Sequence, residues 1–238
     1  MEGTSAAVAR ALDELLMVQP ELAPLRLTSL SLEGVVFEVY QPGDPDQLMD
    51  QLIAKGPAHE DVQDERIPYW ADIWPSALSL ARYLARRPEL VAGRQVLEIG
   101  AGLALPGLMA LRCGASVCIT DYLPGPVALS RVNGLQHLGT MPDCRQMDWR
   151  HPDPALAADV VLASDVAYEA RAFEALVGAF QTLIRPGGIG LLSEPGRPVA
   201  ARLFDLFGQA GFSLHKLIFE EWHHGQPLQI GVYEIRRK

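Results

Sequence analysis

The sequence predicts an α/β fold in which a seven-stranded, mostly parallel sheet carries helices on both faces and ends in an antiparallel hairpin. Two observations predict it. Short apolar segments alternate with helical patterns through the second part of the chain, which is typical of parallel strands joined by crossover helices. The last two apolar segments, 212–219 and 228–235, are joined through the polar link HHGQ, which is too short for a crossover helix.

A small N-terminal extension, residues 1–66, is predicted to precede the main domain, residues 67–238. Ser5 is a candidate cap for a first helix. The apolar positions that share one face of this helix, and that we expect to be buried, are Val8, Leu12, Leu15 and Leu16.

Two strands are expected after this helix, at residues 26–32 and 35–40, with a turn at Glu33–Gly34. Residues 41–66 contain several aspartates, prolines and glycines. This composition predicts a loop that leads into the main domain.

The main domain is expected to contain seven strands and at least three clear helices. The strands are predicted near residues 95–99, 116–120, 144–147, 159–164, 188–193, 212–219 and 228–235. The helices are predicted over 75–87, 169–184 and 198–209 because their apolar residues recur at helical spacing.

The composition limits the classes of function. Apolar residues make up 49% and charged residues 21% of the 238 residues, which is typical of a globular protein with a core of its own. The net charge of −9 argues against nucleic acid as the main partner, because phosphate contacts require a basic surface. An acidic field instead favours a cationic substrate.

No targeting, membrane or metal-binding segment is expected. The N-terminus lacks the basic region of a secretory signal, and the uncharged stretch 99–111 is shorter than the ~18 residues of a membrane span. Cys113, Cys118 and Cys144 form no CxxC pair, which argues against a zinc site. We therefore expect a cytoplasmic protein without metal and without a membrane partner.

A glycine-rich loop in VLEIGAGLALPG, residues 96–107, joins a strand to a helix and marks a ligand site. Gly100 and Gly102 fit the dinucleotide fingerprint G-x-G-x-x-G/A, but Leu105 replaces its third small residue. Glu98 ends the buried strand and has no expected partner. A ligand with hydroxyls and a cationic amine explains Glu98 better than a dinucleotide, and S-adenosylmethionine is such a ligand.

An acidic residue that holds the ribose hydroxyls is then expected about 20 residues beyond the loop, at the end of the next strand. Asp121 stands 19 residues after Gly102. The residues predicted to bind S-adenosylmethionine are therefore Glu98, Gly100, Ala101, Gly102 and Asp121.

Further motifs lie in PYWADIWPSALSLARYL (68–84), SDVAY (164–168) and LIRPGG (183–188). With the glycine loop they resemble the class I methyltransferases, and SDVAY is similar to the D-x-x-Y hallmark of the family 16 lysine methyltransferases. PYWADIWP and EPGRP (194–198) resemble the branch that methylates the electron-transfer flavoprotein β-subunit. The resemblance covers roughly residues 66–235.

The resemblance implies a Rossmann-like fold and a protein-lysine methyltransferase that uses S-adenosylmethionine and acts on a protein presenting a lysine. It implies that Asp165 and Tyr168 orient the acceptor amine. The further cofactor contacts that it implies are Trp74, Asp148, Trp149 and Ser164.

Alternatives remain open at several of these positions. Trp74 could be a core aromatic, Asp148 a turn residue and Trp149 a packing indole. Asp165 could instead cap the helix 169–184. Glu194 and Arg197 could border a substrate channel, as the resemblance implies, or form a surface ion pair.

The function itself also has alternatives. One is a small-molecule N- or O-methyltransferase with residues 1–66 as a lid, and another is a non-catalytic module that binds the cofactor for partner recognition. Arginine is an alternative acceptor to lysine.

Overall fold

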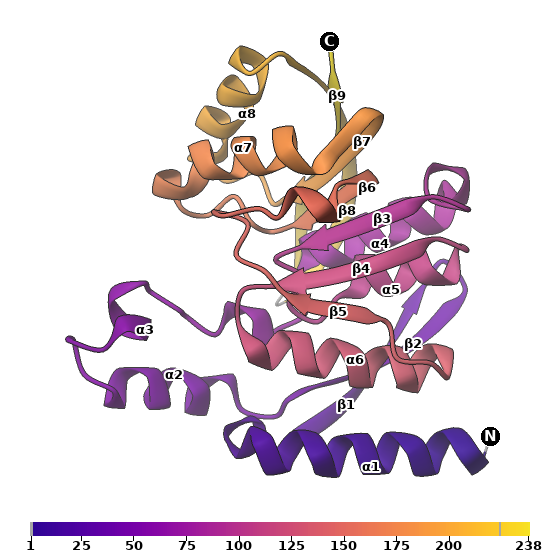
Figure 1. Ribbon diagram of the computed structural model, residues 1–238, viewed down its shortest axis with the longest axis vertical. Coiled ribbons are helices and arrows are strands. Elements are labelled where there is room, and N and C mark those ends of the chain that lie inside the picture. The colour runs from indigo at the N-terminus through magenta and orange to yellow at the C-terminus, as the bar shows by residue number, and fades with distance from the viewer. Residues whose placement is uncertain (1, 224) are drawn as a thin grey trace.

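A computed structural model describes residues 2–223 and 225–238, with the seven-stranded sheet at its centre (Figure 1). Its strands are β3 Gln95–Ile99, β4 Ser116–Asp121, β5 Asp143–Gln146, β6 Ala158–Ser164, β7 Ile184–Glu194, β8 Phe212–His223 and β9 Gln226–Arg237. Their order is β5-β4-β3-β6-β7-β9-β8. β3 to β7 run parallel, whereas β9 is antiparallel to both β7 and β8. The predicted fold class and its C-terminal hairpin are therefore confirmed.

Helices cover both faces of the sheet, because successive strand residues point to opposite sides. The helices are α4 Pro75–Arg86, α5 Leu105–Arg112, α6 Pro124–Leu138, α7 Phe173–Leu183 and α8 Ala200–Gln209. Val96 of β3 packs in a core with α4, α5 and α6, whereas Leu97 packs in a second core with α7 and α8. Figure 1 shows α7 and α8 together beside β6 and β7, apart from α5 and α6.

The N-terminal segment packs on the first of these cores. It consists of α1 Glu2–Val18, the 3-10 helix η1 Pro20–Leu22, β1 Leu25–Leu32 and β2 Val35–Pro42. β1 and β2 form a separate antiparallel pair. The predicted face of α1 is confirmed, because Val8 and Leu15 are buried and Leu12 and Leu16 pack beside them.

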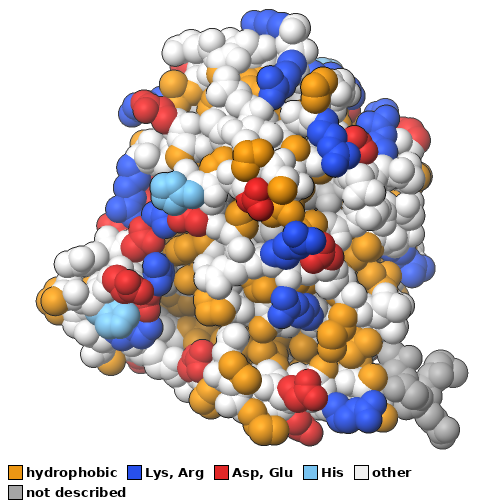
Figure 2. All heavy atoms as spheres, in the orientation of Figure 1, with side chains coloured by type: hydrophobic (Ala, Val, Ile, Leu, Met, Phe, Trp, Pro, Cys, Tyr) orange, Lys and Arg blue, Asp and Glu red, His pale blue; other side chains and the backbone are white. Residues whose placement is uncertain are grey.

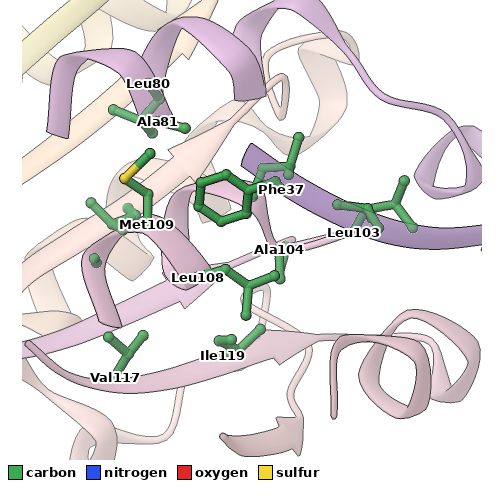
Figure 3. Close-up of a cluster of buried hydrophobic side chains, with 14 of the residues drawn as sticks. Phe37, Leu80, Ala81, Leu103, Ala104, Leu108, Met109, Val117 and Ile119 are labelled. Atoms are coloured by element: carbon green, nitrogen blue, oxygen red, sulfur yellow. The ribbon is translucent and has the colours of Figure 1, made fainter. Parts of the chain in front are cut away.

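β2 is anchored to the main domain by one aromatic ring and one amide. Phe37 is fully buried, and Figure 3 shows its ring in one cluster with Leu80 of α4 and Leu108 of α5. The Asn133 side chain of α6 accepts a hydrogen bond from Tyr40 N at 2.7 Å and donates one to Tyr40 O at 3.0 Å. The boundary between the extension 1–66 and the domain 67–238 stays a prediction.

The turn between β1 and β2 is confirmed at Glu33–Gly34. Glu33 has φ 50° and Gly34 has φ 79°. Two successive positive φ angles match the twist of a tight hairpin, and glycine adopts such an angle without steric cost.

Two predictions for the N-terminal segment are wrong. α1 already begins at Glu2, so Ser5 lies inside the helix and does not cap it. Residues 41–66 are not a continuous loop, because they contain α2 Pro45–Ala54 and α3 Glu60–Gln63. Asp44 accepts a hydrogen bond from Gln47 N at 3.1 Å, so the Asp-Pro pair that suggested a loop is a helix start.

Helix boundaries shift in the main domain as well. The predicted helix 169–184 is a 3-10 turn, η5 Ala170–Ala172, followed by α7, and the predicted helix 198–209 begins only at Ala200. Three further 3-10 turns are η2 Tyr69–Ala71, η3 Pro88–Leu90 and η4 Pro154–Leu156.

The surface carries charges of both signs. On the face shown in Figure 2, Lys and Arg side chains lie interspersed with Asp and Glu. Within residues 2–223 and 225–238, no helix is both long and apolar enough to cross a bilayer. The same residues contain no group of three or more His, Cys, Asp and Glu side chains arranged to hold a metal ion.

Candidate functional site

A cavity of about 510 Å³ lies at the carboxyl edge of the sheet, around the ends of β3, β4 and β6. β3 is the switch point of the sheet, where the strand order reverses: β4 and β5 lie on one side of it and β6 and β7 on the other. Open α/β sheets bind ligands at such a point. The predicted site residues that line this cavity are Trp74, Gly100, Ala101, Gly102, Asp121, Trp149, Ser164, Asp165 and Tyr168.

The glycine loop between β3 and α5 forms the floor of the cavity. Gly100 and Gly102 have φ 59° and 54°, a region that favours glycine. A Cβ on Gly100 would lie 3.0 Å from Val166 Cγ1 and 3.7 Å from Trp149 Nε1, so a side chain there would intrude on the cavity. The loop is tied to β4 because Ala101 N donates to Thr120 O at 3.0 Å.

Glu98 lies outside the lining of this cavity, and the expectation that it has no partner is wrong. It is fully buried, and its Oε2 accepts a hydrogen bond from Gly107 N of α5 at 3.0 Å. Oε1 has no hydrogen-bond partner among the described residues. Burial raises the pKa of Glu98 to about 8. The hydrogen bond from Gly107 N lowers this pKa, and the charge of Asp121 raises it. The side chain therefore links β3 to α5 and holds the loop between them.

Glu98 is expected to make the fold less stable as the pH rises. Its carboxyl ionises near pH 4.5 in the unfolded chain but near pH 8 in the folded one. Between these values the folded protein holds the extra proton, so the free energy of unfolding falls by about 1.4 kcal/mol per pH unit. Asp121, whose pKa is raised to about 6 in the folded protein, makes the free energy of unfolding fall with pH in the same way below about pH 6. The Glu98→Gln variant keeps the acceptor for Gly107 and should lose this slope.

Thermal or urea unfolding of both proteins between pH 6 and 8 isolates the effect of Glu98 as the difference between them, because Asp121 and His137 are common to both. The wild type should lose stability with pH more steeply than Glu98→Gln. Parallel curves would show that the Glu98 carboxyl does not titrate in this range.

Asp121 ends β4 and faces the cavity from the other side of the loop. Its Oδ2 accepts from Gly102 N at 3.0 Å and its Oδ1 accepts from Leu123 N at 3.1 Å. Burial raises the pKa of Asp121 to about 6, although these backbone hydrogen bonds lower it. Each carboxylate oxygen has a further lone pair, so Asp121 can still accept from ligand hydroxyls.

Aromatic side chains form the wall of the cavity before α4. Trp74 precedes Pro75, the first residue of α4, and its Nε1 donates to Tyr69 O at 2.6 Å. The Tyr69 ring contacts the rings of Trp74 and Tyr168 edge to face, at centroid distances of 6.1 and 5.7 Å. Trp74 therefore lines the cavity as part of an aromatic wall and does not lie in the core.

Asp148 and Trp149 follow β5. Trp149 lines both this cavity and an adjoining one of about 570 Å³, whereas Asp148 lines the adjoining one. Both Asp148 oxygens accept hydrogen bonds from Arg150, which also pairs with Asp64. Burial opposes ionisation of Asp148, but Arg150 outweighs it and holds the pKa of that carboxyl below its usual range. A cofactor contact by Asp148 stays a prediction, and its carboxylate is already engaged by Arg150.

Ser164 ends β6 at the cavity, Asp165 follows it directly, and Tyr168 lies three residues further on. The two helical elements that follow begin at Ala170 and Phe173, so Asp165 does not cap a helix. Its Oδ1 instead accepts a hydrogen bond from the Arg197 guanidinium. The alternative of a Glu194–Arg197 surface pair is therefore wrong.

Tyr168 keeps its phenolic proton at neutral pH. Partial removal from water, followed by the charges of Glu169 and Asp121, raises the pKa of Tyr168 to about 12. Its ring is 44% exposed at the cavity. The hydroxyl can therefore donate a hydrogen bond to a ligand but does not act as a base there.

Sequence reasoning missed several lining residues, including Tyr69, Trp70 and Tyr122. Tyr122 follows Asp121 directly, and the guanidinium groups of Arg66 and Arg150 lie 5.8 and 5.6 Å from its ring centroid. The sequence feature that could have identified Tyr122 is its position one residue after the end of β4. Trp70 packs against the loop, and its carbonyl oxygen lies 3.3 Å from where a Gly102 Cβ would stand.

A family model described as lysine methyltransferase matches residues 60–200 of the chain. The histone-arginine methyltransferase METTL23 of Homo sapiens is 35% identical over 122 residues, which are 47% of this chain and 62% of that protein. The electron transfer flavoprotein beta subunit lysine methyltransferase of Danio rerio is 32% identical over 136 residues, or 55% and 51% of the two chains. Across the METTL23 proteins of Homo sapiens, Mus musculus, Rattus norvegicus and Xenopus laevis, the matches span 48% to 62% of the relative's length.

Among solved structures, the magnesium protoporphyrin IX methyltransferase of Synechocystis PCC 6803 with bound S-adenosylmethionine is similar with a TM-score of 0.58. The match covers 82% of this chain and 92% of that one at 16% identity. At this identity the likeness concerns the fold, which is Rossmann-like as the sequence resemblance implied.

Proposed function

The chain belongs to the lysine methyltransferase family, and we propose that it transfers a methyl group from S-adenosylmethionine to a lysine side chain of a protein. One observation carries this proposal. A single cavity at the switch point of the sheet combines the glycine loop and Asp121 with Asp165 and Tyr168. A cofactor site and an acceptor site that share one cavity can bring the two reactants together.

The cavity residues fit S-adenosylmethionine. Asp121 offers acceptor lone pairs for the ribose hydroxyls, and Trp149 offers an aromatic surface for the adenine. The absence of side chains at Gly100 and Gly102 leaves room for a ligand close to the backbone. Ala101, Ser164 and Trp74 complete the proposed contacts, whereas Glu98 supports the loop from behind through Gly107.

When bound, S-adenosylmethionine supplies a methyl group whose carbon forms a bond to the acceptor nitrogen while the carbon–sulfur bond breaks and its electron pair returns to sulfur. The chain must therefore align the acceptor and let it lose a proton to solvent first. A lysine amine has a pKa near ~10.4 in water, and removal from water lowers it. In our proposal Asp165 accepts a hydrogen bond from the amine, and Tyr168 offers its ring face and a phenolic donor.

Arginine is the second candidate acceptor, because the human relative described above is named a histone-arginine methyltransferase. We favour lysine because the family model is described by that activity and because a lysine amine can become neutral in a cavity removed from water. The net charge of −9 favours a protein partner with a basic segment over nucleic acid.

The location and the division of the chain belong to the same proposal. Cys113, Cys118 and Cys144 are free, which favours a reducing, cytoplasmic compartment. We take residues 67–238 as the methyltransferase domain and residues 1–66 as an extension that packs on it.

Asp121→Ala is expected to weaken binding of S-adenosylhomocysteine by about 1–3 kcal/mol, since ligand hydroxyls would lose their acceptor. Calorimetry on the wild type and the variant measures this change, with NAD as the competing ligand class. Micromolar binding of NAD without binding of S-adenosylhomocysteine would contradict the proposed cofactor. An unchanged affinity in Asp121→Ala would restrict Asp121 to the hydrogen bonds it makes with the loop.

Methyl-labelled S-adenosylmethionine, added to whole lysate with the protein, separates the classes of function. A labelled protein band supports the proposal. Label in small molecules only would indicate a small-molecule methyltransferase, and binding without any transfer would indicate a non-catalytic module.

A further inference from the structure

One of the two carboxylate oxygens of Asp165 has no hydrogen-bond partner among the described residues. It has a left-handed backbone conformation, with φ 57°, and its N–H donates to Ser193 O at 2.9 Å. Oδ1 is engaged by Arg197, whereas Oδ2 is buried and has no hydrogen-bond partner among residues 2–223 and 225–238. A buried carboxylate oxygen without a partner is costly, and Asp165 is one of the residues that line the cavity, so this carboxylate is marked for a ligand.

The backbone of Arg197 is fixed by a hydrogen bond to the Glu194 carboxylate. Glu194 ends β7 and is 1% exposed. Its Oε2 accepts from Gly196 N at 2.7 Å and from Arg197 N at 2.9 Å. Its Oε1 accepts from the Tyr233 hydroxyl of β9 at 3.2 Å. Glu194 thus fixes the turn after β7, and the guanidinium of Arg197 extends from this fixed turn to Asp165.

We propose that Arg197 is a positioning residue for methyl transfer. It orients Asp165 so that Oδ2 accepts a hydrogen bond from the acceptor amine, and its guanidinium offsets the negative charge of the Asp165 carboxylate. The inference rests on the proposed function. An uncompensated carboxylate would stabilise the protonated amine, which cannot attack. A carboxylate that is paired with a guanidinium stabilises the protonated amine less, so it raises the pKa of the bound amine less than a bare carboxylate would.

This arrangement also bears on the class of acceptor. A lysine amine can arrive neutral beside the Asp165–Arg197 pair. An arginine acceptor stays charged, so it would bring a second guanidinium next to Arg197. The pair therefore favours lysine over arginine.

The test is a set of four proteins: Arg197→Met, Arg197→Lys, Asp165→Asn and the double variant Arg197→Met/Asp165→Asn. Methyl transfer to the labelled lysate target is measured for each, together with S-adenosylhomocysteine affinity and melting temperature. Arg202→Met is the matched control, because Arg202 is an exposed arginine of α8 that pairs with exposed Glu174 at 3.9 Å.

Arg197→Met should lower kcat by roughly 10- to 100-fold, since a misplaced orienting group costs that much. Cofactor affinity should stay unchanged, Arg197→Lys should recover part of the rate, and Arg202→Met should behave like the wild type. In the Asp165→Asn background the Arg197→Met change should cost nothing further.

The pH profile supplies a readout that a purely structural role would not move. Without Arg197 the bare carboxylate of Asp165 holds the proton on the amine, so the acidic limb of kcat should move about 1 pH unit higher. The double variant should lack this shift. The other ionisable groups that line the cavity are the carboxyls of Glu65, Asp72, Asp121 and Glu169 and three tyrosine hydroxyls, and they are common to all the proteins.

Wild-type kcat in a folded Arg197→Met protein would overturn the inference, as would losses that multiply independently in the double variant. A fall in melting temperature and cofactor affinity that matches the fall in kcat would also overturn it, in favour of a structural role. If the wild type binds no S-adenosylhomocysteine and transfers no methyl group, the proposed function fails, and the inference fails with it.

Discussion

Asp165→Asn is expected to lower the rate of methyl transfer by at least ~100-fold, because an amide NH2 group replaces the Oδ2 acceptor that we propose for the amine. The change removes the negative charge but keeps the shape of the side chain. Asparagine tolerates the left-handed φ of 57° about as well as aspartate does. Its amide oxygen can still accept from Arg197, so the fold should change little.

The measurement is a transfer rate beside a melting curve and a binding curve for S-adenosylhomocysteine. Cofactor affinity should hold, because Asp165 is not one of the proposed cofactor contacts, which are on the glycine loop, Trp74, Asp121, Trp149 and Ser164. Asp143→Asn is the matched control, since Asp143 pairs with Arg145 at the start of β5, away from the cavity. Near-normal turnover by folded Asp165→Asn would mean that the Asp165 charge has no part in catalysis.

Gly107→Ala is expected to destabilise the fold by about 1–5 kcal/mol after the gain in helix propensity, because overpacking and an unpaired buried polar group each cost about 1–3 kcal/mol. A Cβ on Gly107 would stand 2.3 Å from Glu98 Oε2 and 3.1 Å from Ile119 Cγ1. Glu98 would have to move, and its one hydrogen bond from Gly107 N would break. The helix-forming tendency of alanine returns only about 1 kcal/mol, which this range already includes.

A fall in melting temperature of roughly 2–20 °C is the expected readout, given about 2–4 °C per kcal/mol in a chain of this size. Gly178→Ala in α7 is the matched control, because nothing lies within 4 Å of its added Cβ. The double variant Gly107→Ala/Glu98→Ala should lose less than the sum of the two single changes. A Gly107→Ala protein as stable as the wild type would show that Glu98 has room to move.

The centre of the sheet could be predicted from the sequence because β3, β6 and the second half of β7 are buried on both faces and therefore read as continuous apolar segments. The antiparallel hairpin followed from the length of one link. α2 was missed because Asp44 and Pro45 are both turn formers and helix starters, and only the burial of Leu48 and Leu52 in the fold separates the two roles.

The cavity lining could be predicted where function depends on position after a strand, as for Gly100, Asp121 and Asp165. Partners could not be predicted where they come from distant segments. Glu98 meets Gly107 only because α5 packs against β3, and Arg197 meets Asp165 only because β6 and β7 lie side by side. Such pairs depend on the tertiary arrangement, which local patterns do not encode.

Mass spectrometry of the proteins that become labelled by the wild type in lysate tests the central claim most directly. The proposal predicts methyl groups on lysine side chains of one or a few proteins, and their loss when Asp165→Asn replaces the wild type. Methyl groups found only on arginine, on nucleic acid or on small molecules would contradict it.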